Sequence, residues 1–263
     1  DLQNLGLMDI AEAERGLVLM MTPANGASWS EEDADVYWEI IDQLGQSGAN
    51  NRFVASFSNL IYAIAEGDGA TFVHNILSQN AHRIAGVLTF GGEVDNPENL
   101  MPLPAYLVNA DKKIIDFYKE INDTDKETTI NENVCYYNEI LNTKKVIVNE
   151  SKTSEFDKSI IIDAWYSLLR KITRNVMHDV VWMDAQTREV FTLMDRIDPV
   201  ESGLDFKYEQ PEGHVGYYIW QPSEALNQTD EKYPLVFCVH GGNDHPVFEA
   251  ECQGWVELAA KEK

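Results

Sequence analysis

The stretch from Ile64 to Ala70 reads IAEGDGA and joins an apolar run to a segment with helical periodicity. A tight turn of small residues between a buried strand and a helix can present a nucleophile, because the strained turn lifts one side chain above the sheet. Such a turn needs small residues two positions before and two positions after the nucleophile. Ala65 and Gly69 meet this requirement, so the nucleophile position falls on Gly67, which has no side chain.

A register shifted by one residue makes Asp68 the nucleophile, a role that carboxylates take in covalent catalysis. This register is less favourable, because it places Glu66 where only a small group fits. Glycine at position 67 also relieves the backbone strain that a serine would carry there. The sequence therefore favours an elbow with the shape but not the chemistry of a nucleophile turn, with Asp68 as the alternative nucleophile.

Strands and helices alternate along most of the chain, which predicts a mostly parallel sheet covered by helices on both faces. Short apolar runs bounded by turn residues predict buried strands at 16–23, 59–65, 83–92, 103–111 and 144–150. Capping residues and apolar stripes predict helices at 30–45, 70–80, 112–122 and 159–174. The later part differs, with antiparallel strands expected at 180–195, 204–210 and 215–222, a buried strand at 233–242 and a helix at 246–263.

Two segments of the later part resemble the opening of an α/β-hydrolase domain of the polyhydroxybutyrate-depolymerase and feruloyl-esterase-like family. They are YPLVFCVHGG at 233–242 and GWVELAAKEK at 254–263. In this resemblance, IYAIAEGDGA corresponds to the nucleophile strand and elbow, and AYLVNAD to the strand that ends in the acid. It covers nearly the whole chain and implies an α/β-hydrolase fold, with the elements in circularly permuted order.

The two ends of the chain resemble each other. Residues 6–15 align without gaps to residues 254–263, at a separation of 248 residues. This repeat suggests a window cut from a tandem pair of hydrolase-like repeats. Chance similarity between short amphipathic helices is the alternative, but the matching order of neighbouring strands favours the repeat. Residues 1–175 then form the C-terminal part of one repeat and 176–263 the N-terminal part of a repeat, which together close as one unit or exchange an end with a neighbour.

The resemblance assigns one acid and no base. Asp111 matches the family's catalytic acid, although a helix cap before Lys112 explains this residue equally well. The family places its histidine between the last strand and the last helix, and the corresponding loop at 149–159 contains none. Without that base, an attacking hydroxyl cannot be activated.

The resemblance also assigns an oxyanion-hole loop. His240, Gly241 and Gly242 match the loop that supplies one backbone N–H donor, and the second donor is expected from the backbone of Asp68. A metal site at His240, Asp244 and His245 is disfavoured, because these residues share one short loop without a recognisable ligand pattern. His74 and His82 are expected to be surface or helix-end residues, and His178 and His214 lie outside the site strands.

Composition excludes some partners. The chain has 44 acidic against 20 basic residues and a formal charge of −24, which disfavours binding to nucleic acid or to anionic membranes. No apolar run is long enough for a membrane span. Cys135, Cys238 and Cys252 have no metal-ligand spacing and are expected to be buried free thiols.

These observations predict a catalytically inactive α/β-hydrolase-fold domain with a structural or binding role and no cofactor. Its expected partners are an adjacent repeat, a second copy of the chain, or a small ester or carbohydrate-linked ligand. The alternative is an active carboxylic-ester hydrolase that uses Asp68, or residues completed by another chain. Fold alone does not decide between them, because function belongs to the site.

Overall fold

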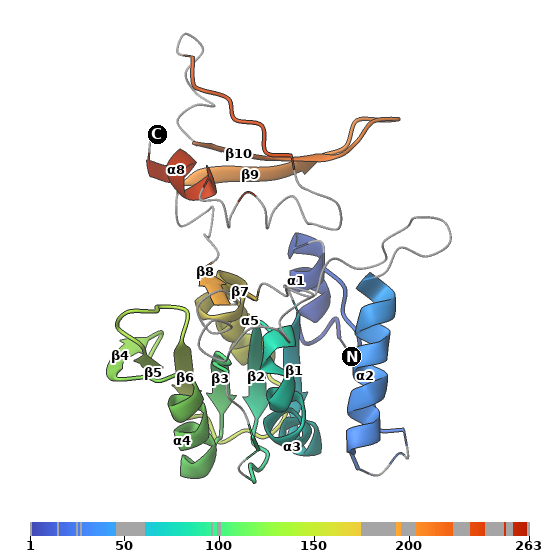
Figure 1. Ribbon diagram of the computed structural model, residues 1–263, viewed down its shortest axis with the longest axis vertical. Helices are drawn as coiled ribbons and strands as arrows, with labels where there is room; N and C mark the ends of the chain where they lie inside the picture. The colour runs from blue at the N-terminus through green and yellow to red at the C-terminus, as the bar shows by residue number, and fades with distance from the viewer. Residues whose placement is uncertain are drawn as a thin grey trace. The chain divides into compact units, whose positions relative to one another are not determined.

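The computed structural model divides into two compact units, residues 1–195 and 196–263 (Figure 1). The first unit contains a six-stranded sheet with helices, and the second contains a two-stranded sheet and one described helix. The structure describes residues 2–14, 16–24, 26, 28–45, 61–95, 97–98, 101–174, 193–195, 203–222, 232–239, 250 and 255–261.

The six-stranded sheet confirms the predicted α/β class. Four parallel strands lie side by side in chain order: β1 (Tyr62–Glu66), β2 (Gly86–Phe90), β3 (Ala105–Val108) and β6 (Lys145–Asn149). A hairpin of β4 (Lys126–Ile130) and β5 (Asn133–Tyr137) continues the sheet beyond β6 with antiparallel pairing. The sheet order is β1-β2-β3-β6-β5-β4, so β1 and β4 are the two outer strands among the residues that the structure describes.

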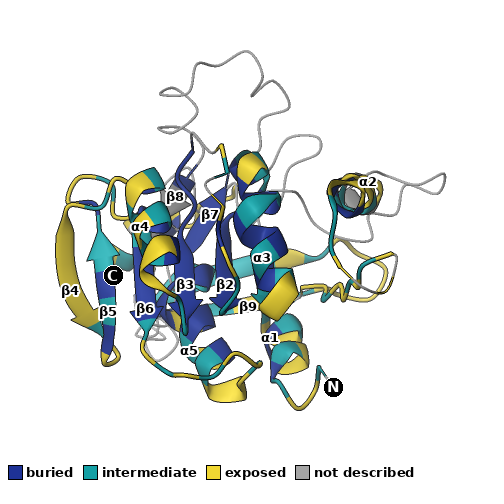
Figure 2. Cartoon of the chain, turned by 90° about the horizontal axis from the view of Figure 1, so that it is seen from below, coloured by how far each residue is buried: buried dark blue, intermediate teal, exposed yellow. Residues whose placement is uncertain are grey.

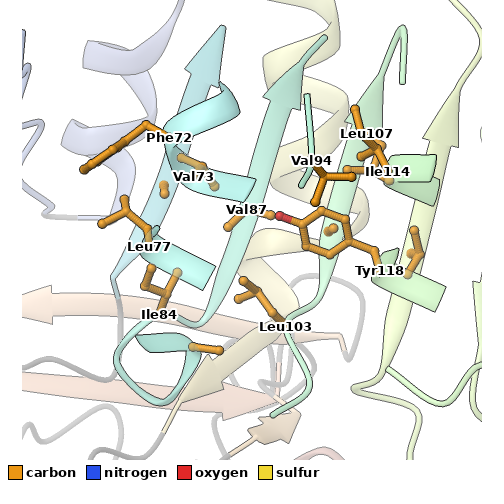
Figure 3. Close-up of a cluster of buried hydrophobic side chains, with 14 of the residues drawn as sticks. Phe72, Val73, Leu77, Ile84, Val87, Val94, Leu103, Leu107, Ile114 and Tyr118 are labelled. Atoms are coloured by element: carbon orange, nitrogen blue, oxygen red, sulfur yellow. The ribbon is translucent and has the colours of Figure 1, made fainter. Parts of the chain in front are cut away.

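Helices cover both faces of this sheet (Figure 2). On one face, α2 (Glu31–Gly45), α3 (Gly67–Asn75) and α4 (Lys112–Ile121) share a hydrophobic cluster with strand residues. On the other face, α1 (Leu7–Glu14) and α5 (Lys158–Ser167) belong to a second cluster. Figure 3 shows the first cluster, in which Phe72, Val73 and Tyr118 lie over the strands. Covering both faces explains why every residue of β2 and β3 is buried.

Two predicted helices are shorter than their sequence patterns suggest. α3 ends at Asn75 and is followed by 3-10 turns at Leu77–Arg83. α5 ends at Ser167, where Leu169–Lys171 form a 3-10 turn before the short strand β7 (Ile172–Arg174). β7 pairs in antiparallel fashion with β8 (Leu193–Asp195), the described part of the strand predicted at 180–195.

The β4–β5 hairpin is an element that the apolar periodicity does not predict. Its turn residues Asn131 and Glu132 both have positive φ, 48° and 67°. This geometry matches the twist of paired strands, and Asn tolerates it because its short polar side chain suits a left-handed backbone. The sequence feature that predicts this hairpin is therefore INEN, which is rich in Asn and lies between two runs of β-forming residues.

Two strands predicted to be buried are not strands among the described residues. Residues 16–24 lie outside helix and strand, and Met20 is 72% exposed. Residues 232–239 are likewise irregular, and Phe237 is 83% exposed. Apolar composition alone does not make a strand, because the backbone also needs a neighbouring strand to bond with. No described strand pairs with either segment.

In the second unit, the predicted antiparallel pair is confirmed. β9 (Leu204–Glu209) pairs along its full length with β10 (Tyr217–Pro222), and the described helix is α8 (Trp255–Lys261). Leu204 and Val256 are buried together, with Trp220 packed against them. The aromatic side chains of the pair stack across the two strands, as Phe206 does with Tyr218.

Two of the three cysteines can be placed. Cys135 is buried in β5 as predicted, whereas Cys238 is exposed, because its apolar segment is not covered within the described part of the chain. Cys252 lies outside the described residues.

Gly92 provides a test of how closely the loop after β2 packs on α3. Its φ is +88°, and a Cβ there would lie 2.9 Å from the Cβ of Ala70 and from the backbone N of Thr71. We expect Gly92→Ala to lower the free energy of unfolding by about 3 kcal/mol, through left-handed strain and overpacking. The matched control is Gly67→Ala, where φ is +54° but the Cβ meets nothing within 4 Å. Urea denaturation should show a loss of only about 1 kcal/mol for the control, and equal losses would contradict the close contact.

Candidate functional site

The turn between β1 and α3 has the predicted strand–turn–helix form. Glu66 is extended, with φ −131° and ψ 153°, and Gly67 then adopts φ +54° as the first residue of the helix. A Cβ at Gly67 would meet no atom within 4 Å, so the position is open. The turn therefore presents bare backbone at the carboxyl end of β1.

The spacing around the turn supports the register centred on Gly67. A Cβ at Gly69 would lie 3.7 Å from the Cβ of Ala65, so these two positions face each other across the turn. The indole of Trp29 lies beside the same turn, and its Nε1 is 3.6 Å from the Cβ position of Gly69. Asp68 is exposed in the first turn of α3. Its carboxylate lies beside the helix N-terminus, where negative charge is favourable.

The loop after β6, in which the resemblance expects a histidine, crosses the carboxyl ends of the parallel strands. The backbone N–H of Phe156 donates to Oε2 of Glu66 at 2.6 Å, which ties the loop to the elbow. The side-chain amide of Asn109, at the end of β3, donates to Oγ of Ser154 at 2.7 Å. The loop thus lies beside the elbow, and the two residues that make these contacts, Ser154 and Phe156, carry no imidazole.

Asp111 acts as a helix cap. It is extended at the N-cap position of α4, and its Oδ1 accepts a hydrogen bond from the N–H of Ile114 at 2.9 Å. Of its two predicted roles, the structure therefore shows the cap. Asp111 is exposed at the carboxyl edge of the sheet, two residues after Asn109, whose φ of 50° is left-handed.

His74 is a buried core residue. It lies near the C-terminal end of α3 as expected, but the expectation of surface exposure is wrong, because its side chain is fully buried. Nδ1 lies 3.0 Å from the hydroxyl of Tyr118, and Nε2 lies 3.2 Å from the carbonyl oxygen of Gly91. Burial lowers the pKa of His74 to about 4, partly opposed by the hydrogen bond to Gly91 and by the charge of Asp111. Both nitrogens are engaged in the core, so His74 is not placed to act as a base at the elbow.

The predicted oxyanion-hole loop cannot be placed. His240, Gly241 and Gly242 lie outside the described residues, as do Asp244 and His245. The other expected donor, the backbone of Asp68, stands in the first turn of α3, where helix N–H groups lack intrahelical partners.

A polar cluster between α5 and the sheet is a feature that the sequence analysis did not find. The hydroxyl of Tyr106 donates to Oδ2 of Asp163 at 2.5 Å, and Nδ2 of Asn133 donates to the same oxygen at 3.0 Å. Nδ2 of Asn131 donates to the other oxygen at 2.7 Å. Burial and the hydrogen bond to Asp163 raise the pKa of Tyr106 far above its usual range. Neutral donors thus satisfy this carboxylate, and the cluster joins α5 to β3 and β5.

Within the described ranges, no group of three or more His, Cys, Asp or Glu side chains is arranged to hold a metal ion. No helix in that part of the chain is long and apolar enough to cross a membrane. Comparisons of the chain with family models, with curated proteins and with solved structures give no match.

The buried His74 predicts an acid-sensitive fold. Its pKa falls from 6.5 in the unfolded chain to about 4 in the folded protein, so the unfolded state binds more protons between these values. The contribution of His74 to stability is complete above pH 6.5 and is lost as the pH falls towards 4. We expect a loss of about 2 kcal/mol between pH 7 and pH 5 from this group alone. Urea denaturation at both pH values measures this loss in the free energy of unfolding. The variant His74→Gln has no titrating ring, so its loss between pH 7 and pH 5 should be smaller by about 2 kcal/mol. Equal pH dependence of the two proteins would contradict the assignment.

The cap at Asp111 predicts two different outcomes for two substitutions. Asp111→Ala removes the acceptor of the Ile114 N–H and should lower the free energy of unfolding by about 1 kcal/mol. Asp111→Asn keeps an acceptor oxygen and should lower it by only a few tenths. Thermal or urea denaturation distinguishes them, and equal losses would mean that the charge matters and the cap does not.

Proposed function

We propose that this chain is an esterase-type α/β-hydrolase-fold domain that lacks catalytic activity and serves a structural or binding role. The observation that carries the proposal is Gly67, a left-handed glycine at the open position of the turn between β1 and α3. A serine nucleophile would need a hydroxyl at this point.

The arrangement of the parallel strands supports the esterase-type assignment. The elbow follows β1, Asp111 follows β3, and the loop with Phe156 follows β6 and bonds to Glu66. The resemblance assigns the nucleophile, the acid and the histidine to these three places, in this chain order. Their meeting at one edge of the sheet follows from the parallel pairing of β1, β2, β3 and β6.

The proposed lack of catalysis is supported by the structural hydrogen bonds that polar groups form at this edge. Glu66 holds the backbone of Phe156, Asn109 holds Ser154, and Asp111 caps α4. His74 points into the core. The remaining members of a triad do not make good the loss of nucleophile and base together.

The proposed binding role uses the open position above Gly67. The Cβ position of Gly67 is open, and the backbone N–H groups of the first turn of α3 have no partners within the helix. A small ester or a carbohydrate-linked ligand that presents a carbonyl oxygen is the chemical class that suits such donors.

The test is hydrolysis of an aryl ester together with labelling by a fluorophosphonate, on the wild-type chain, on Gly67→Ser and on Gly67→Ala. We expect no label and no turnover above the uncatalysed rate for any of the three, because the serine variant still lacks a base. Gly67→Ala serves as the matched control, since it adds the same Cβ without a hydroxyl.

Two outcomes contradict the proposal. High activity of Gly67→Ser would mean that a base already stands beside the elbow. Turnover by the wild-type chain that disappears in Asp68→Asn would favour the active hydrolase with a carboxylate nucleophile.

A further inference from the structure

The two outer strands of the six-stranded sheet differ in sequence and in exposure. β4, at one edge, has the sequence KETTI, is almost wholly exposed, and carries Lys126 in an ion pair with Glu139 at 3.4 Å. Charged and polar side chains of this kind protect an edge against pairing with another strand. β1, at the other edge, has the sequence YAIAE, with no lysine or proline, and is partly or fully buried throughout. β1 therefore has the composition of an internal strand.

Helices pack on β1 from both faces of the sheet. Ile10 of α1 belongs to the hydrophobic cluster that includes Ile64 on one face. Trp38 of α2 belongs to the cluster that includes Ala63 on the other face. α1 and α2 thus lie on opposite faces of the sheet, and Met20, in the chain between them, is exposed. Parallel strands that are covered on both faces have near-continuous apolar sequences, as β1 has from Tyr62 to Ala65.

The pairing register shows which backbone groups point outwards. Val87 N–H bonds to Pro104, so the odd-numbered residues of β2 face β3 and the even-numbered residues face β1. Leu88 is aligned with Ile64, and in a parallel pair one aligned residue directs both of its backbone groups to its neighbour while the other directs both away. The N–H and C=O of Ile64 therefore point to the outer side of β1, where no described strand pairs.

The same chain carries an apolar segment suited to that edge. Residues 235–239 read LVFCV, and the side chains of Leu235, Phe237 and Val239 are 77%, 83% and 86% exposed. An exposed apolar run of this kind marks an interaction site. Pro234 stands directly before it, at the one position of a strand where a missing N–H costs least.

The internal repeat suggests that this segment is the matching strand. Residues 254–263 resemble residues 6–15, which include α1. Residues 235–239 precede residues 254–263 in the chain. α1 packs in one cluster with Ile64 of β1. The strand that precedes a helix of this type is thus expected beside β1. Apolar strands that are covered by helices on both faces are typical of parallel sheets, so we expect this strand to run in the same direction as β1.

We propose that residues 235–239 of one copy of the chain add as a parallel strand to the outer edge of β1 in a second copy, in a reciprocal exchange. The occupant is this segment because it is apolar on both faces, as a strand between two helical layers must be, and because the repeat predicts a strand beside β1. When two copies exchange the same segment, they form a closed two-fold dimer. The dimer needs no contact other than that between residues 235–239 and β1. This inference goes beyond the proposed function and holds whether or not the elbow is catalytic.

The first test is the oligomeric state of the full chain, measured by sedimentation velocity over a wide range of concentrations. We expect a dimer, and we expect Phe237→Asp to raise its dissociation constant by at least about tenfold, because each exchanged strand buries that ring. The matched control is Ile140→Asp, which places the same charge at another exposed apolar residue, 88% exposed in the first unit, and should leave the dimer unchanged. Val239→Asp provides a second variant, and circular dichroism checks that each variant remains folded.

The second test locates the contact by amide hydrogen exchange. We expect the Ile64 amide to exchange more slowly in the wild-type dimer than in Phe237→Asp. A synthetic peptide of residues 232–239, added to the Phe237→Asp chain, should restore slow exchange at Ile64, whereas the same peptide with aspartate at position 237 should not. A monomer at every concentration, or a dimer that dissociates equally in Phe237→Asp and Ile140→Asp, would overturn the proposal. Unchanged exchange at Ile64 on dimerisation would also overturn it.

Discussion

The left-handed backbone of Gly67 fixes where β1 ends and where α3 begins, and the carboxyl edge of the sheet is built around that point. The chain enters the helix within one residue, so the first turn of α3 lies directly beside the sheet. This position brings Ala70 so close to Gly92 that no side chain fits between them. It also brings Glu66 within reach of Phe156, which holds the loop after β6 across the strand ends. Packing and hydrogen bonds thus sustain the strand–turn–helix geometry at Gly67.

Glu66, Asn109 and Asp111, near this edge, have structural partners. A hydrogen bond to a buried or partly buried group is costly to leave unmade, which gives each of these residues a role without chemistry. Asp111 satisfies the N-terminus of α4, and Asn109 joins the end of β3 to Ser154. His74 and Tyr118 bond to each other inside the core, where burial keeps the imidazole neutral. A shape that serves stability in this way does not require catalysis to explain it.

The parallel core and the elbow are predictable from the sequence, because both depend on local signals. Apolar runs of strand length between helical periods give β1, β2, β3 and β6, and small residues at 65, 67 and 69 give the turn. The burial of His74 is not predictable in this way, since it depends on the contact with Tyr118, 44 residues further on. The same holds for Asp163, whose partners Tyr106 and Asn133 come from two other elements. Such contacts depend on tertiary arrangement, and no periodicity encodes them.

Two predicted strands are not strands in the part of the chain that the structure describes, and the reason is different. Residues 16–23 and 233–242 have the composition of internal strands, but a strand exists only where a neighbour accepts its hydrogen bonds. The one edge of the sheet that is chemically suited to an apolar strand is that of β1, which ends at the elbow. A strand added there would border the turn at Gly67 and would fix the elbow between two neighbours. Association through this edge and the shape of the candidate site would then be coupled, because both depend on the same five residues of β1.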